Sequence, residues 1–174
     1  MIETPRLLLR PFRLEDWEAF HQLLSDPLVM QYEPYPPFSL MQSRDETLRR
    51  AGNRGYMAVC LRDGTLIGSI SLLHRGQDCW ELSLLFGRDW WGMGYGQESA
   101  VAALDWAFKQ RGAHRISARC HPDNLRCCQL LERLGMRREG CFRQNLRFSV
   151  TPDGDPEWQD TLYYAILADE WPPV

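Results

Sequence analysis

Hydrophobic residues follow two spacings along the chain, and turn-forming residues separate the segments that show them. Apolar runs bounded by Pro, Gly or Asp predict β-strands, whereas apolar residues three or four positions apart predict α-helices. The first pattern predicts strands over residues 7–10, 56–61, 66–74, 79–86, 114–120, 136–148 and 157–167. The second predicts helices over residues 14–24, 39–52 and 95–110, and a further helix between residues 124 and 135.

Polar residues at the predicted helix starts supply cap oxygens for unpaired backbone N–H groups. Asp16 is the expected cap of the first helix. Ser39 is followed by Gln42 at the spacing of a capping box, which predicts where the second helix begins. Either Asp123 or Asn124 is expected to fill the same role at the last helix.

The predicted element order is β-α-α-β-β-β-α-β-α-β-β, which is typical of the α/β (α+β) class. One strand–helix–strand crossover, from residues 79–86 to 114–120, should place two strands parallel, whereas hairpins join most other neighbours. We therefore expect a mixed, mostly antiparallel sheet of about seven strands flanked by about four helices. The 174 residues suit a single domain over 1–174, because no linker or repeat interrupts them.

Composition and charge exclude several classes of protein. A net charge of −3 argues against a nucleic-acid binder that depends on a broad basic surface. No membrane association is expected, because no apolar run approaches the roughly 20 residues of a membrane span. The first residues also lack the pattern of a signal peptide. A cytoplasmic location follows, in which the six cysteines stay reduced.

The cysteines and histidines do not predict a metal site. Cys79, Cys120, His74 and His121 lack a recognisable zinc-ligand spacing, and the chain has no C-x-x-C pair. Buried free cysteines are the commoner case, and both histidines are expected at the surface or in turns rather than in catalysis. We therefore expect no bound metal.

Three glycines at alternate positions, Gly92, Gly94 and Gly96, lie between a predicted strand and a predicted helix. Glycine lets the backbone turn sharply and approach a ligand, and a helix start offers free N–H groups and a positive dipole end. Together they predict a cradle for a phosphate or pyrophosphate. The only lysine is Lys109, so a lysine-dependent P-loop is excluded.

The cradle and three other stretches resemble the GCN5-related N-acetyltransferases. The family pattern Q/R-x-x-G-x-G/A maps onto residues 91–96, with Trp91 in place of Gln or Arg. That tryptophan, the T-P-R-L-L-L-R opening at 4–10, the segment 124–136 and the ending 160–171 are similar to the RimJ/RimL-like ribosomal-protein acetyltransferase branch. In segment 124–136, Cys127 stands where that branch commonly has serine.

The resemblance implies an acetyl-CoA donor as co-substrate and names the residues expected to hold it. Strand backbone groups should meet the pantetheine arm, the cradle should bind the pyrophosphate, and residues of the last helix should also contact the coenzyme. In that order they are Leu84, Leu85 and Phe86; Trp91, Gly92, Met93, Gly94, Tyr95, Gly96 and Gln97; and Asn124, Cys127 and Arg133. The rival is a dinucleotide fold, but its G-x-G-x-x-G spacing is absent and the motif lies after antiparallel hairpins.

Glu81 is the leading candidate for a general base. On an extended strand it shares a face with Ser83, and a carboxylate near the cleft can take a proton from the incoming ammonium. The alternative is a salt-bridged or solvated strand glutamate. Glu33 and Asp160 are weaker rivals for the role.

Asn124 and Cys127 are the other candidate catalytic residues. Asn124 either caps its helix alone or also hydrogen-bonds the pantetheine, as the matching asparagine does in relatives. Cys127 is either the acid that protonates the departing CoA thiolate or a small packing residue. A covalent acetyl-cysteine would need an activating histidine, and none is evident in the sequence.

The sequence contains fewer signals for the acceptor than for the acetyl donor. Tyr32, Glu33 and Tyr35 join the first two helices and should wall the acceptor side together with Glu81. The expected activity is acetyl transfer to a primary amine by direct attack, with protein N-terminal α-amines leading and small amines or antibiotics open. An acyl-CoA-binding module without catalysis is the alternative. The family also suggests a homodimer through the C-terminal strands.

Overall fold

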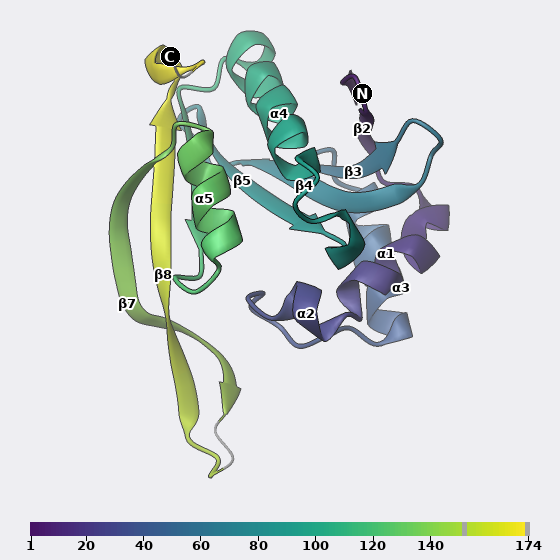
Figure 1. Ribbon diagram of the computed structural model, residues 1–174, viewed down its shortest axis with the longest axis vertical. Helices are drawn as coiled ribbons and strands as arrows, with labels where there is room; N and C mark the ends of the chain where they lie inside the picture. The colour runs from purple at the N-terminus through teal and green to yellow at the C-terminus, as the bar shows by residue number, and fades with distance from the viewer. Residues whose placement is uncertain (151–152, 173–174) are drawn as a thin grey trace.

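An eight-stranded mixed sheet organises the chain in a computed structural model that describes residues 1–150 and 153–172 (Figure 1). The strands are β1 (Ile2–Glu3), β2 (Leu7–Pro11), β3 (Tyr56–Leu61), β4 (Leu66–His74), β5 (Cys79–Phe86), β6 (Arg115–Cys120), β7 (Arg137–Val150) and β8 (Pro156–Leu167). The helices are α1 (Trp17–Leu24), α2 (Pro27–Met30), α3 (Leu40–Ala51), α4 (Tyr95–Arg111) and α5 (Leu125–Arg133). Short 3₁₀ turns are η1 (Leu14–Asp16), η2 (Arg88–Trp90) and η3 (Ala168–Glu170). The sheet order is β1-β2-β3-β4-β5-β6-β8-β7.

The predicted order is confirmed, with two short elements added. The sequence pattern did not show β1, which has two residues and pairs only with β2. It also missed α2, a single turn that begins at Pro27 and is capped by the Asp26 carboxylate, which accepts from the N–H of Leu28 at 2.9 Å. The capping box of Ser39 and Gln42 is confirmed at the start of α3.

Asp16 is the N-cap residue of α1, as the sequence predicts, but its carboxylate makes no capping hydrogen bond. Residues 14–16 form η1, the α-helix begins at Trp17, and the Asp16 carboxylate caps nothing in α1. Both its oxygens instead accept from Arg10, each at 2.7 Å, and one also accepts from the N–H of Arg13 at 2.7 Å. A buried arginine needs a carboxylate partner, and this need outweighs helix capping.

The two faces of the sheet carry separate clusters of buried side chains. Met57 and Val59 of β3 pack on the face covered by α4 and α5, whereas Ala58 and Cys60 pack on the face covered by α1. This alternation is the expected period of a strand that is buried on both faces. Figure 1 shows α4 and α5 side by side on one side of the sheet and α1 to α3 on the opposite side.

The central pair of parallel strands separates partway along its length. β5 and β6 pair from Cys79 and Arg115 to Leu82 and Ala118, and no further. Beyond that point β5 continues to Phe86 on β4, while β6 continues to Cys120 on β8. The sheet therefore opens as a V between the carboxyl ends of the two strands.

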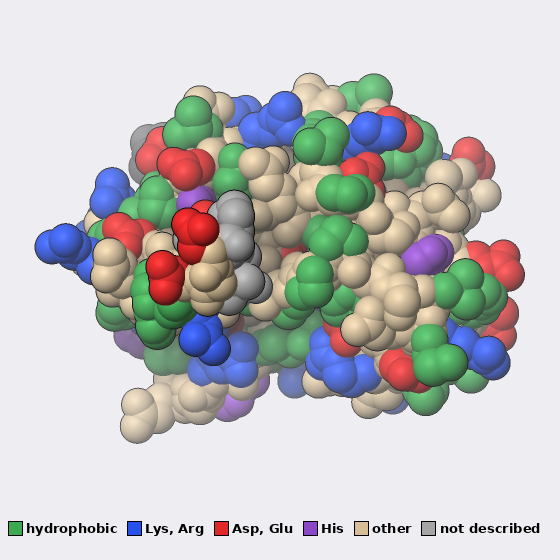
Figure 2. Space-filling view, turned by 90° about the horizontal axis from the view of Figure 1, so that it is seen from below, with side chains coloured by type: hydrophobic (Ala, Val, Ile, Leu, Met, Phe, Trp, Pro, Cys, Tyr) green, Lys and Arg blue, Asp and Glu red, His purple; other side chains and the backbone are tan. Residues whose placement is uncertain are grey.

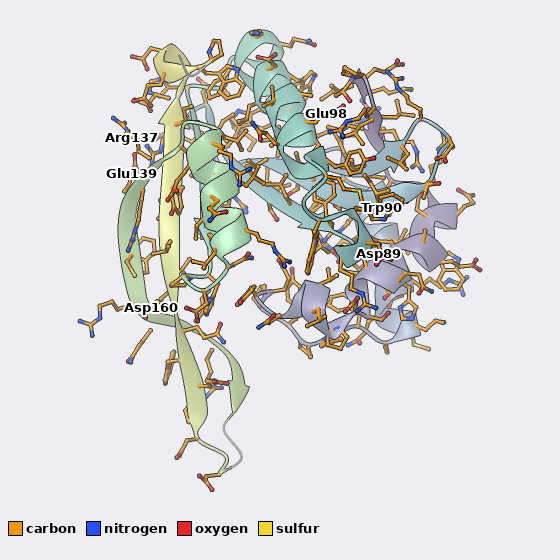
Figure 3. All side chains as sticks on the ribbon, in the orientation of Figure 1. Asp89, Trp90, Glu98, Arg137, Glu139 and Asp160 are labelled. Carbon is orange, nitrogen blue, oxygen red and sulfur yellow. The ribbon has the colours of Figure 1, made fainter. Side chains whose placement is uncertain are left out.

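The last two strands extend well beyond the rest of the sheet as a long hairpin (Figure 1). β8 pairs with β6 only from Leu162 to Leu167, and its earlier residues pair with β7 alone. Asp160 lies near the point where the hairpin leaves the sheet (Figure 3). Its carboxylate accepts from the N–H of Gln144 at 2.8 Å, which stabilises an irregular stretch of β7 where Gln144 has a φ of 48°.

Candidate active site

The glycine cradle lies directly after β5, at the mouth of the V. Asp89 and Trp90 lie on the turn that leads into it, and Glu98 lies in the first turn of α4 (Figure 3). Gly92 and Gly94 have φ values of 76° and 81°, a left-handed conformation that favours glycine. A Cβ added at position 92 would meet no atom within 4 Å, so the loop is open toward a ligand.

The amides of this loop are available to an anion. Glu98 has the first N–H of α4 that bonds back to the chain, at the Gly94 carbonyl, 3.0 Å away. Among the described residues, no backbone carbonyl accepts from the N–H groups of Tyr95, Gly96 or Gln97. These orphan donors at the positive end of a 17-residue helix fit a pyrophosphate. The residues present therefore fit the phosphate part of coenzyme A.

Trp91 connects the cradle to the open end of β5. Its indole Nε1 donates to the Phe86 carbonyl at 2.8 Å, which fixes the loop against the strand that precedes it. Arg126, in the first turn of α5, places its guanidinium 4.4 Å from the centre of the Trp91 ring. A positive group from the opposite side of the V thus lies beside the cradle.

The N-terminal segment holds the cradle from the other side. The Glu98 carboxylate accepts from the hydroxyl of Thr4 at 2.6 Å and from Nε of Arg6 at 2.6 Å. Burial alone would raise the pKa of Glu98, but these hydrogen bonds outweigh it and lower the pKa. Arg6 also donates to the Met93 carbonyl at 2.9 Å and covers the Tyr95 ring at 4.5 Å.

α5 presents Asn124 and Cys127 at the opposite arm of the V. The Asn124 side chain accepts from the N–H of Cys127 at 3.2 Å, so its role as a helix cap is confirmed. Cys127 is half-buried, next to a buried pair of thiols in which Sγ of Cys120 lies 3.5 Å from Sγ of Cys128. The hydrogen bond with Cys127, reinforced by burial, raises the pKa of Cys120, so that thiol stays protonated.

Glu81 lies on the face of β5 opposite to the buried Trp80 and Leu82, as its strand position predicts. One carboxylate oxygen accepts from Arg119 at 2.6 Å and the other from Arg75 at 3.0 Å. Both oxygens are therefore already paired. Two guanidinium groups therefore compete with an incoming ammonium for the Glu81 carboxylate.

The acceptor-side segment reaches the open end of β6. The rings of Tyr32 and His121 stack with their centres 5.1 Å apart, so the chain just after α2 touches the loop just after β6. Glu33, the next residue, makes no side-chain hydrogen bond or ion pair within the described part of the chain, and burial raises the pKa of its carboxyl although Arg50 opposes this. Tyr35 packs edge-on against Phe38 at 5.4 Å.

Comparison with known proteins decides the family. The model of the acetyltransferase (GNAT) domain matches residues 6–137. The uncharacterized N-acetyltransferase YnaD of Bacillus subtilis (strain 168) is 37% identical over 173 residues, which cover 98% of this chain and 98% of YnaD. The chain belongs to the GNAT acetyltransferase family. It is accordingly an acyltransferase with the GNAT fold, a family whose general acyl donor is acetyl-CoA.

Two further relatives bear on the GNAT assignment. The crystal structure of a GNAT acetyltransferase from Bacillus anthracis superposes with a TM-score of 0.87 at 36% identity, covering 97% of this chain and 99% of that one. The ribosomal protein uS5-alanine N-acetyltransferase of Escherichia coli (strain K12) is 32% identical over 92 residues, 53% of this chain and 44% of that enzyme. The second likeness covers only part of each chain.

The remaining candidate residues from the sequence differ in where they lie relative to the V. Leu84, Leu85 and Phe86 lie beyond the last β5–β6 pair, where the strand edge is open. Arg133 is exposed and donates back to the Gln129 carbonyl of its own helix at 3.2 Å. Asp160 bonds within the hairpin, a structural role for this rival base.

Sequence reasoning missed Arg126 in this GNAT site, and it did not show the long-range contact made by His121, which lies in the turn after β6 as expected. Arg126 lies four residues before Leu130, whose side chain would touch a Cβ added at Gly96, so helical spacing alone places it on the cradle side. The His121 side chain is only 15% exposed, and its Nδ1 accepts from the N–H of Asp123 at 3.1 Å. Its stacking on Tyr32 is a long-range contact that no local pattern shows.

Metal binding and membrane crossing are the two further features for which the described residues can be examined. Among the described residues, no three His, Cys, Asp or Glu side chains gather in a way that could hold a metal. No helix in the described part of the chain is long and apolar enough to cross a membrane. Figure 2 shows a lower face on which acidic, basic and apolar side chains are intermixed, without a broad patch of one charge.

Proposed function

We propose that this chain transfers the acetyl group of acetyl-CoA to a primary amine by direct attack within a ternary complex, with protein N-terminal α-amines as the leading acceptors. The observation that carries the proposal is the coincidence of the V with the cradle. The strand edge opens beyond Leu82, and orphan amides from Tyr95 to Gln97 lie at its mouth. An elongated thioester with a pyrophosphate fits this arrangement.

The donor is held, in this proposal, by three groups of residues. The amides from Gly92 to Gln97 bind the pyrophosphate, and the free edge from Leu84 to Phe86 pairs with the pantetheine arm. Asn124 and Cys127 flank that arm from α5, and Arg133 takes a more distant phosphate. A strand N–H at the open edge also steadies the oxyanion that forms when the amine attacks the thioester carbonyl.

Two carboxylates compete for the role of base. Glu81 was the first choice from sequence, but Arg75 and Arg119 occupy both its oxygens. Glu33 is free of such partners among the described residues, and its raised pKa makes it the better proton acceptor near neutral pH. A nearby ammonium would find at Glu33 the unpaired negative charge that Glu81 lacks.

Cys127 is the proposed acid. As the C–N bond forms and the C–S bond breaks, the coenzyme leaves as a thiolate that needs a proton. A half-buried thiol on α5 can donate that proton, and Cys127 supplies it in this mechanism. The covalent alternative is not proposed, because no histidine of the described residues hydrogen-bonds the Cys127 thiol and Nδ1 of His121 accepts from the Asp123 amide.

The acceptor class rests on a partial likeness. The uS5-alanine N-acetyltransferase acetylates a protein amine, and its match to half of this chain supports membership of the RimJ/RimL-like branch. Tyr32, Glu33 and Tyr35 wall the acceptor side, with a carboxylate suited to an ammonium group. A small-molecule amine or antibiotic would use the same carboxylate and is the second candidate.

The test is an acceptor panel with base variants. Peptides with free N-termini should be acetylated faster than N-terminally blocked peptides containing lysine, and faster than polyamines. Glu33→Gln should lower kcat/KM at least tenfold, whereas the exposed Glu18→Gln on α1 should not change it. If Glu81→Gln causes the larger loss, the base is Glu81. Binding of acetyl-CoA without acetylation of any amine would favour the non-catalytic module.

We also propose an oligomeric state and a cellular location for the protein. A homodimer through the C-terminal strands is supported by Phe142 and Trp158, which are 53% and 51% exposed on the β7–β8 hairpin. A cytoplasmic location is supported by the six free cysteines. Sedimentation of the purified protein tests the first, and fractionation of the source cells tests the second.

A further inference from the structure

A cavity lies at the end of the sheet opposite to the cradle. It has a volume of about 890 Å³ and lies between the N-terminal residues, the start of β3, the end of β4 and the last turn of α4. The N-terminus and this end of α4 are both at the top of Figure 1, whereas the cradle lies at the other end of α4. No cradle residue lines the cavity.

The wall of this cavity is aromatic. Trp80, which is only 9% exposed, meets Trp106 edge-on at 6.2 Å on one side and His74 at 5.2 Å on the other. Tyr56 and the buried Met57 complete the apolar surface. A volume of this size, lined mainly by apolar and aromatic side chains, is within the range of about 300–1,000 Å³ that small-molecule sites occupy.

The rim of the cavity is positive. Arg54, Arg75 and Arg111 line it, and no Asp or Glu of the described residues does. The whole chain has a net charge of −3, so arginines without a carboxylate beside them in the lining are unexpected. The local charge therefore favours a negatively charged occupant.

Two of the three guanidinium groups have no anionic partner within the described part of the chain. Arg75 is paired with Glu81, but no hydrogen bond or ion pair engages the Arg54 side chain. Arg111 makes only a cation–π contact, 5.3 Å from the centre of the Trp106 ring. Guanidinium groups beside an aromatic wall can bind a carboxylate or phosphate while the ring of the same ligand packs on tryptophan.

We propose that this cavity is a second binding site, for a small molecule that joins a flat apolar ring to an anionic group. Arg54 and Arg111 bind the anionic group, and the aromatic wall packs on the ring. An aryl carboxylate and a purine monophosphate both present this chemistry. The site is separate from the cradle, so the proposal stands whether or not the catalytic assignments hold.

Calorimetric titration of the full chain, saturated with coenzyme A, tests the proposal. The probes are indole-3-acetate and adenosine monophosphate, with indole and acetate as controls for the ring and the charge alone. We expect saturable one-to-one binding of at least one two-part probe. Indole and acetate should each bind at least about tenfold more weakly, because indole lacks the charge-assisted hydrogen bonds and acetate lacks the ring that packs on tryptophan.

Charge variants identify the residues. Arg54→Ala with Arg111→Ala should weaken binding at least about tenfold, and Arg54→Glu with Arg111→Glu should abolish it. Both side chains are exposed, so the variants should keep the fold, and a circular dichroism spectrum checks this. Arg138→Ala with Arg143→Ala, on exposed positions of β7, is the matched control and should leave binding unchanged.

Three results would overturn the proposal. They are the absence of saturable binding by either two-part probe, binding that the Arg54 and Arg111 variants leave unchanged, and binding that occurs only when coenzyme A is left out of the sample.

Discussion

Arg6 and Glu98 lie 92 positions apart in sequence, yet Nε of the arginine is 2.6 Å from Oε2 of the glutamate. The same arginine donates to the Met93 carbonyl at 2.9 Å. The start of the chain is thereby joined to the loop that should bind the pyrophosphate. The Arg6–Glu98 ion pair links the fold of the N-terminal strands to the function of the cradle.

Glu98→Gln should weaken coenzyme A binding about tenfold, or about 1.4 kcal/mol. Glutamine keeps only one acceptor oxygen, so the hydrogen bond from Nε of Arg6 to the second carboxylate oxygen is lost and the loop is held less firmly. Calorimetric titration with coenzyme A measures the change. Glu139→Gln is the control, since Glu139 pairs with Arg115 away from the cradle (Figure 3). Equal affinities for the Glu98 variant and the wild type would show that the Arg6–Glu98 ion pair does not support coenzyme A binding.

Gly92→Ala should lower both stability and coenzyme A affinity. A φ of 76° costs a residue with a Cβ about 1–2 kcal/mol, and relaxation of the loop would misplace its amides. Gly64→Ala is a matched control, because Gly64 has a φ of 94° and equally open surroundings in a distant turn. Urea denaturation should show a similar loss for both variants. Only the Gly92 variant should lose affinity, and equal effects on affinity would argue against the cradle.

Arg126→Ala should raise the dissociation constant of coenzyme A about tenfold. The variant removes a positive group held over the Trp91 ring beside the orphan amides. Arg126→Lys should give an intermediate value, because it keeps the charge and loses the planar contact. Arg138→Ala, an exposed arginine of β7, serves as the comparison. An unchanged constant in Arg126→Ala, measured at low ionic strength, would remove this residue from the donor site.

Asp16→Asn should destabilise the fold by about 3–5 kcal/mol, because it leaves the buried Arg10 guanidinium without its carboxylate. Burial would raise the pKa of Asp16, but the hydrogen bonds from Arg10 and Arg13 outweigh it and lower the pKa below the unfolded value of about 3.9. The stabilisation is therefore complete above about pH 4–5 and is lost as the pH falls through the folded value.

Urea denaturation as a function of pH tests this assignment. Wild-type stability should fall below about pH 4 more steeply than that of Asp16→Asn, which has no carboxylate to protonate at this position. Parallel curves for the two proteins would contradict the role given to Asp16.

Cys127→Ala should lower kcat at least tenfold while leaving the KM for acetyl-CoA within about twofold, since a general acid contributes to the transition state rather than to binding. Cys127→Ser should retain more activity, because the hydroxyl keeps a donor at the same position. Steady-state kinetics with a peptide acceptor gives both constants. An unchanged kcat in Cys127→Ala would leave this residue as a packing group.

The sequence predicted the helices and strands that have clear periodicity, and the glycine loop between β5 and α4. It could do so because hydrophobic spacing, capping residues and glycine are local signals. β1 and α2 were missed because two residues, or a single turn, are too short to show a period. Asp16 was placed correctly at the start of α1, but its ion pair with Arg10 was missed, because Arg10 lies outside that helix.

The candidate site was less predictable than the fold. Glu81 was placed on the correct face of its strand, but the arginines that pair with it come from the following turn and from β6. Glu33 is favoured as the base because burial raises its pKa, and that burial depends on how α3 and the segment after α2 pack. Contacts such as Tyr32 with His121 join distant segments and leave no trace in local spacing.

The most direct test of the central claim is the stoichiometry of acetyl transfer from acetyl-CoA. Purified protein is incubated with acetyl-CoA and a panel of free-amine peptides, and released thiol is measured together with N-acetylated product by mass spectrometry. We predict equal amounts of thiol and N-acetylated peptide, and a strong loss of both in Gly92→Ala. Saturable acetyl-CoA binding with no acetylated amine, or thiol release without product, would contradict the account.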